Sequence, residues 1–245
     1  MRRNNAGVTA SGYDEPAAAG SSVRGGLKIC DLVPALGKRG FLVGKTGSGK
    51  STLALVLTEE LYARQPLLVL DPKGTWPIPP YATLWHGLKY PIEGSYVVYR
   101  PEFGTDCQDE IDGICQMVFD NAKKGFPCAV YIDEVGPLLG RETTTGPRNL
   151  KFLYTQGRQL GVTMLCGTQR PASIPLYLMT ESEYLYAFNL RNGRDRDRMG
   201  ELFGPAFKET IKPFWFRFYT EQDDVHASPL KLGEDTVRMY SPGWS

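Results

Sequence analysis

Long apolar runs, paired cysteines and histidines are all scarce in this chain of 245 residues. No stretch approaches the ~20 apolar residues of a membrane-spanning helix, and the amino terminus lacks the apolar core of a secretory signal. The five cysteines form no CxxC pair and there are two histidines, which disfavours a metal cluster and indicates reduced thiols. A net charge of +1 excludes a uniformly basic surface, so contacts with nucleic acid must come from local patches.

Composition divides the chain into a short tail and one long domain. Residues 1–26 are rich in Gly, Ala and Ser and have almost no large aliphatic side chains, so we expect a flexible tail. Residues 27–245 are expected to form a single domain, because a chain of this length with 42% hydrophobic residues can bury one sizeable core.

Apolar runs and helical stripes alternate from residue 39 onward. Strands are expected at 40–43, 66–70, 96–99, 128–132, 162–167, 184–190 and 213–219, and helices at 50–63, 107–124, 149–159, about 176–181 and 195–203. Short continuous apolar strands that alternate with helices predict a parallel sheet covered on both faces. The proline-rich stretch 72–95 is expected to be irregular.

The segment from Gly44 to Ser51 fits G-x-x-x-x-G-K-[ST] at every position. An apolar strand precedes it and a helix with a leucine every four residues follows it, which is the context that a phosphate-binding loop needs. The residues expected to bind nucleotide are Gly44, Lys45, Thr46, Gly47, Ser48, Gly49, Lys50, Ser51 and Thr52. In such loops the lysine reaches the β- and γ-phosphates and the final hydroxyl binds Mg²⁺, so Lys50 and Ser51 take these roles. The chain is therefore expected to bind ATP and Mg²⁺.

Two apolar strands end in an aspartate that could complete the magnesium site, Asp71 and Asp133. Glu134 follows Asp133 directly, and a carboxylate beside the magnesium-binding aspartate is well placed to deprotonate an attacking water. Pro72 follows Asp71 instead and offers no base. We therefore assign Asp133 to the metal and Glu134 to the water. A separate catalytic glutamate also predicts that the strand ending at Gly167 lies between the Gly44 strand and the Asp133 strand.

Two further side chains are candidates for catalysis. Gln169 follows a central strand, where ligands bind in open α/β sheets, and can contact the γ-phosphate and the attacking water. Arg158 ends a helix that we expect on the active edge of the sheet, from which it could reach the γ-phosphate of a neighbouring subunit. Arg148 and Arg141 are weaker candidates for this role.

Four motifs in order resemble the HerA/FtsK superfamily of DNA-pumping ATPases: Asp71-Pro72-Lys73-Gly74, Asp133-Glu134, Gly157-Arg158 and Thr168-Gln169-Arg170-Pro171. The resemblance covers about residues 38–220. It implies an α/β fold of the RecA-like (ASCE) P-loop NTPase type, with three α/β/α layers and a mainly parallel sheet. It also implies that Gln169 is the sensor and Arg158 the finger that acts in trans. The chain departs from the common pattern at Gly74-Thr75-Trp76, where an acidic residue often follows the glycine.

The chain has no room for the extra domains of chromosome translocases, so we expect a bare motor. Such a motor resembles the genome-packaging ATPases of tailless, membrane-containing double-stranded DNA viruses. That resemblance implies DNA translocation by a homo-oligomeric ring, hexamer or pentamer, at a capsid or portal vertex in the host cytoplasm. Two alternatives stay open. One is an assembly or secretion ATPase that acts on protein, and the other is a small-molecule kinase with the arginine-rich segment 191–198 as a lid. Glu134 and Gln169 suit attack by water, which disfavours the kinase.

Overall fold

The computed structural model describes residues 28–85, 95–101, 107–139, 147–220 and 229–233. In this part of the chain, nine strands form one sheet in the order β3-β4-β2-β5-β6-β1-β7-β8-β9. The strands are β1 (Arg39–Val43), β2 (Leu67–Leu70), β3 (Thr83–Trp85), β4 (Tyr96–Tyr99), β5 (Ala129–Ile132), β6 (Thr163–Thr168), β7 (Tyr184–Phe188), β8 (Trp215–Thr220) and β9 (Leu230–Lys231). The first seven in spatial order pair in parallel, and β8 and β9 are antiparallel.

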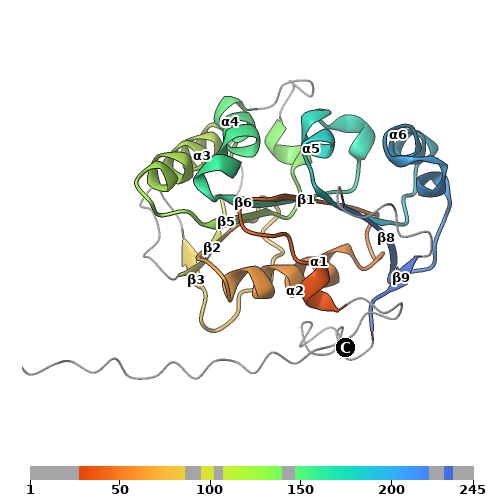
Figure 1. Ribbon diagram of the computed structural model, residues 1–245, viewed down its shortest axis with the longest axis horizontal. Helices are drawn as coiled ribbons and strands as arrows, with labels where there is room; N and C mark the ends of the chain where they lie inside the picture. The colour runs from red at the N-terminus through yellow and green to blue at the C-terminus, as the bar shows by residue number, and fades with distance from the viewer. Residues whose placement is uncertain (1–27, 86–94, 102–106, 140–146, 221–228, 234–245) are drawn as a thin grey trace, which may run out of the picture.

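Helices cover both faces of this sheet (Figure 1). On one face lie α1 (Ile29–Leu32) and α2 (Lys50–Tyr62), and on the other lie α3 (Cys107–Lys123), α4 (Arg148–Gln156), α5 (Tyr177–Thr180) and α6 (Gly193–Phe203). Short 3₁₀ turns, η1 (Gly136–Leu139), η2 (Gly157–Leu160), η3 (Pro171–Ser173) and η4 (Pro205–Lys208), join these elements. The arrangement confirms the expected α/β/α sandwich of the RecA-like class.

The apolar strands of the sheet supply side chains to two cores. Along β1, Phe41 and Val43 belong to the core under α3 and α4, whereas Leu42 belongs to the core under α2. Successive side chains of a strand point to opposite faces, so a strand buried on both faces must be apolar throughout. The continuous apolar run in the sequence is the consequence of this double burial.

The central strand order places the predicted catalytic strands side by side. Strand β6 lies between β1 and β5, with Phe41 in register with Cys166 and Tyr131 in register with Leu165. This is the order predicted from the separate glutamate. Because parallel strands end at one edge, the residues after β1, β5 and β6 meet there.

Several boundaries differ from the sequence-based expectation. Strand β3 lies within the stretch 72–95 that was expected to be irregular, and β9 and α1 were not predicted. Strand β8 begins at Trp215, not 213, because Phe214 has a left-handed backbone. The predicted tail at residues 1–26 lies outside the described residues. Among the described helices, none is both long and apolar enough to cross a membrane.

Candidate active site

The loop between β1 and α2 has the backbone shape of a phosphate cradle. Gly47 and Gly49 have left-handed φ angles of 73° and 104°, which side chains rarely adopt. A Cβ added to Gly44 would lie 2.6 Å from the Ser48 hydroxyl. Gly49 is also the N-cap of α2, and no side chain caps it. The first N–H groups of the helix are therefore available to an anion.

Neighbouring strands hold this loop in place. The Gly44 N–H donates to the carbonyl of Thr168 at 3.1 Å, and the Lys45 N–H donates to the carbonyl of Asn189 at 2.9 Å. Thr168 is the last residue of β6 and Asn189 directly follows β7, and these two strands flank β1. The loop is thus fixed before any ligand binds, which lowers the entropic cost of binding.

Lys50 is a nearly buried cation that faces the end of β5. Its Nζ donates to the Asp133 carbonyl at 3.2 Å and lies 3.9 Å from Asp133 Oδ1. Burial lowers the pKa of Lys50, and the charges of Asp133 and Glu134 oppose this shift. Gly167 permits the close approach, because a Cβ there would lie 2.6 Å from the Asp133 carbonyl and 3.2 Å from Lys50 Nζ. An anion bound in the loop would stabilise this ammonium.

The two predicted carboxylates, Asp133 and Glu134, are buried side by side and held by donors from other elements. Asp133 Oδ1 accepts a hydrogen bond from the Tyr131 hydroxyl at 2.9 Å. Glu134 Oε1 accepts from Thr168 Oγ1 at 2.7 Å and from the Gln169 N–H at 3.2 Å. Glu134 is therefore fixed in orientation at the carboxyl ends of β5 and β6, as a general base must be.

Lys73 also contacts this site, a role that the sequence did not reveal. Its Nζ lies 3.0 Å from Glu134 Oε2, across 61 residues of sequence. It is also close enough to Lys50 for its charge to lower the pKa of that lysine further. The quoted Asp71-Pro72-Lys73-Gly74 motif was the available signal, but only the fold shows which side chain Lys73 reaches.

Asp71, the competing candidate for the metal, is fully buried and engaged elsewhere. It accepts hydrogen bonds from the N–H groups of Thr75 at 3.1 Å and Trp76 at 2.9 Å, and from Arg100 Nε at 2.8 Å. These bonds fold the loop that carries Lys73. Asp71 therefore organises a neighbouring loop, which supports the assignment of the metal to Asp133.

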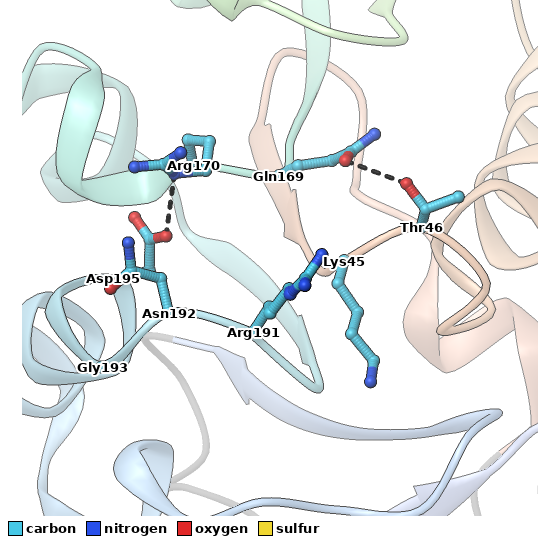
Figure 2. Close-up of a pocket in the computed structure, with 8 residues that line it drawn as sticks. All are labelled: Lys45, Thr46, Gln169, Arg170, Arg191, Asn192, Gly193 and Asp195. Carbon is cyan, nitrogen blue, oxygen red and sulfur yellow. Dashed lines mark hydrogen bonds and ion pairs between the residues drawn. The ribbon is translucent and has the colours of Figure 1, made fainter.

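The remaining predicted residues around the phosphate loop are consistent with a nucleotide and its cation. Gln169 Oε1 accepts a hydrogen bond from Thr46 Oγ1 at 3.0 Å, so the side chain bridges β6 to the loop (Figure 2). Ser51 lies in the first turn of α2 directly after Lys50, whose Nζ is 3.9 Å from Oδ1 of Asp133, the residue that follows β5. A hydroxyl and a carboxylate are oxygen ligands of the kind that Mg²⁺ prefers, so this donor set fits the ion.

Arg158 does not lie where the sequence suggested. It belongs to η2, which precedes β6, and it pairs with Glu183 at 3.0 Å just before β7 begins. It therefore lies at the amino edge of the sheet, and the expectation that it lies on the active edge is wrong. Helix α4 leads into η2 and runs antiparallel to the strands. The end of α4 next to Arg158 is therefore one strand length, roughly 20 Å, from the residues after β6. Arg158 is too far away to serve the site of its own subunit.

The other arginine candidates differ in position. Arg148 begins α4, at the opposite end from Arg158, and its guanidinium lies 5.6 Å from the centre of the Phe152 ring. Arg141 lies outside the described residues.

A cavity of about 930 Å³ opens beside the phosphate loop. It is lined by Lys45, Thr46, Gln169, Arg170, Arg191, Asn192, Gly193 and Asp195, which Figure 2 draws. Asp195 is buried and accepts from Arg170 Nε at 3.0 Å and from the Ala172 N–H at 3.1 Å. This ion pair and that between Lys208 and Asp197 join the two aspartates of segment 191–198 to residues outside the segment.

Comparison with known proteins supports the resemblance seen in the motifs. A family model described as the central domain of the helicase HerA matches residues 31–76. The DNA packaging ATPase P9 of Enterobacteria phage PRD1 is 28% identical over 208 residues, which cover 84% of this chain and 87% of that protein.

Solved structures agree on the fold. The genome packaging NTPase B204 of Sulfolobus turreted icosahedral virus 2, in complex with AMPPCP, matches with a TM-score of 0.64 and 16% identity over 80% of this chain and 97% of that one. ATPase domains 2 and 3 of EssC from Geobacillus thermodenitrificans match with a TM-score of 0.54 and 14% identity over 83% of this chain and 43% of that one. The resemblance to HerA/FtsK-type P-loop ATPases, and among them to viral DNA packaging ATPases, is thereby confirmed.

Proposed function

We propose that this chain is an ATP-hydrolysing motor that translocates double-stranded DNA and packages a viral genome into a preformed capsid. One observation carries the proposal. Lys50, Glu134 and Gln169 come from three elements and meet at one edge of the sheet, with Glu134 held by Thr168 and by the Gln169 N–H. The similarity to a phage DNA packaging ATPase over most of both chains supports the same conclusion.

The residues divide the work of hydrolysis. The N–H groups of the Gly44–Ser51 loop and the Lys50 ammonium bind the phosphate chain, where the cation neutralises charge on the β- and γ-phosphates. Ser51 and Asp133 would hold Mg²⁺, which neutralises further phosphate charge when bound. Glu134 accepts a proton from the attacking water. The oxygen of that water bonds to the γ-phosphorus, and the bond between the γ-phosphorus and the oxygen of the departing ADP breaks. Gln169 orients that water, because it links the phosphate loop to the base.

The cation that completes the site is proposed to come from a neighbouring subunit. Arg158 lies at the amino edge of its own sheet, with its side chain 54% exposed. An arginine in this place is out of reach of the site in its own subunit, so any γ-phosphate that it contacts would belong to another copy. We therefore propose a homo-oligomeric ring, hexamer or pentamer, around the duplex, acting in the host cytoplasm at a capsid or portal vertex.

An assembly or secretion ATPase that acts on protein is the second candidate, since the cytoplasmic domain of the type VII secretion ATPase EccC from Thermomonospora curvata shares the fold. The two functions differ in which polymer stimulates turnover. Phosphate release by the purified protein should therefore be measured with double-stranded DNA, with an unfolded polypeptide and with neither.

We expect DNA alone to stimulate the wild type, with no phosphorylated acceptor formed. Glu134→Gln should bind ATP and lose about 10²–10⁴-fold in rate, because a general base contributes that much. Stimulation by polypeptide but not by DNA would contradict the packaging proposal. Transfer of phosphate to a small molecule would indicate a kinase instead.

A further inference from the structure

Phe214 has an unusual backbone for a residue with a side chain. Its φ is 61°, and among the described residues no other residue except glycine has a positive φ. This left-handed conformation brings Cβ close to the following carbonyl oxygen and is unfavourable. Such residues persist where surrounding bonds fix them, and they cluster at ligand sites.

Two backbone hydrogen bonds fix Phe214 to the phosphate loop. Its N–H donates to the carbonyl of Ser48 at 2.8 Å, and its own carbonyl accepts from the Leu232 N–H at 3.0 Å. A Cβ added to Gly49 would lie 3.0 Å from Phe214 Cδ1, so the ring rests on the glycine that begins α2. The loop and this ring are therefore one rigid unit.

The ring is also exposed where burial would be expected. Phe214 keeps 38% of its surface accessible, although the neighbouring Phe216 and Phe188 are buried in the core. The contact with Gly49 leaves the residue this exposed, so packing alone does not explain the strained conformation.

Strand order shows which end of a nucleotide would face this ring. Glu134 and Gln169 follow β5 and β6, which lie on one side of β1, and they mark the γ-phosphate end. Strands β7 and β8 lie on the other side of β1, and Phe214 directly precedes β8. A nucleotide whose phosphates occupy the loop therefore directs its nucleoside toward β7 and β8.

We propose that the Phe214 ring is the stacking platform for the base of the bound nucleotide. The flat ring offers a π face to the flat base, and stacking of this kind accepts adenine and guanine alike. The inference rests on the nucleotide site of the proposed function and adds the residue that binds the base. The strained backbone is the cost of placing the ring against the phosphate loop.

The substitution Phe214→Gly removes the ring and keeps the backbone conformation, so it tests the contribution of the ring alone. Glycine adopts φ of 61° without strain and keeps the N–H that bonds to Ser48. Titration calorimetry with Mg²⁺ should compare AMPPCP with inorganic tripolyphosphate, which has no base. We expect the variant to bind AMPPCP about 5- to 150-fold more weakly, the effect of losing one aromatic stack, and tripolyphosphate unchanged. Phe214→Tyr should keep both affinities.

Thermal unfolding completes the test, because relief of strain should leave the unfolding midpoint of Phe214→Gly equal to or above that of the wild type. Phe126→Gly, at another exposed phenylalanine, is the matched control and should bind both ligands normally. Unchanged AMPPCP affinity in Phe214→Gly would overturn the inference, and so would equal loss of both ligands, which indicates a purely structural role. Wild-type protein that binds neither ligand would contradict the proposed function itself.

Discussion

At the scale of single residues, the site holds two lysines against two carboxylates. Lys50 and Lys73 approach Asp133 and Glu134 from different elements, at 3.9 Å and 3.0 Å between charged atoms. Burial disfavours the charge on Lys50, whereas Lys73 is more exposed. The unequal burial indicates unequal roles. Lys50 is directed to the phosphates, and Lys73 is directed to the general base Glu134.

Substitution of Lys73 by methionine tests the second role. The change keeps an unbranched side chain only one atom shorter but removes the ammonium that contacts Glu134. We expect kcat to fall about tenfold, equivalent to ~1.4 kcal/mol in the transition state, and KM for ATP to change less. Steady-state phosphate release measures both. Lys124→Met, at an exposed lysine, is the control, and a normal kcat in Lys73→Met would show that the contact is not used in catalysis.

The sequence predicted site residues unevenly. Lys50 and Ser51 belong to a local pattern in which every position is fixed by the shape of one loop, so spacing alone reveals them. The contact of Lys73 with Glu134 joins positions 61 residues apart, and nothing local encodes it. Phe214 was read as part of an aromatic strand, because its left-handed backbone depends on Ser48 and Leu232, which lie far away in the sequence.

At the scale of elements, periodicity predicted the sheet well and the loops poorly. The apolar runs at β2, β4 and β5 are buried on both faces, and double burial leaves a direct mark on composition. Strand β3 is exposed and lies in a proline-rich stretch, so it leaves no such mark. The end of α4 was misplaced because a helical stripe does not show which edge of the sheet the helix reaches.

The loop that follows β2 is an element organised by one buried aspartate. In Asp71→Asn a single carbonyl replaces the two oxygens that accept from Thr75, Trp76 and Arg100. We expect the free energy of unfolding to fall by about 2–4 kcal/mol, and turnover to fall as Lys73 is displaced. Denaturant titration measures the first effect. Asp120→Asn, at an exposed helix surface, should change the unfolding free energy little, and an equally small change in Asp71→Asn would contradict this role.

At the scale of the whole molecule, the length of the parallel strands separates the catalytic groups from Arg158. The site lies at the carboxyl edge of β1, β5 and β6, while Arg158 and Glu183 lie at the amino edge. One subunit therefore presents a site at one edge and a candidate finger at the other, which suits a head-to-tail ring.

Mixed rings test whether Arg158 acts in trans. Arg158→Ala subunits and Lys50→Ala subunits should each be inactive alone, because one lacks the finger and the other the phosphate cation. In a mixture, rings that place an intact Arg158 against an intact Lys50 should regain part of the ATPase rate, since such fingers are worth about 10³–10⁵ in turnover. Absence of recovery, in rings shown to be mixed, would exclude Arg158 and make Arg148 the next candidate.

The central claim is that hydrolysis at this site moves double-stranded DNA, and displacement of the third strand from a DNA triplex tests it most directly. We predict that wild-type protein displaces the strand when ATP is added, and that Glu134→Gln binds the same DNA and ATP without displacing it. The contrary result is a wild-type protein that hydrolyses ATP at full rate, with DNA present, while the triplex stays intact. That result would show an ATPase at this site that does not translocate DNA.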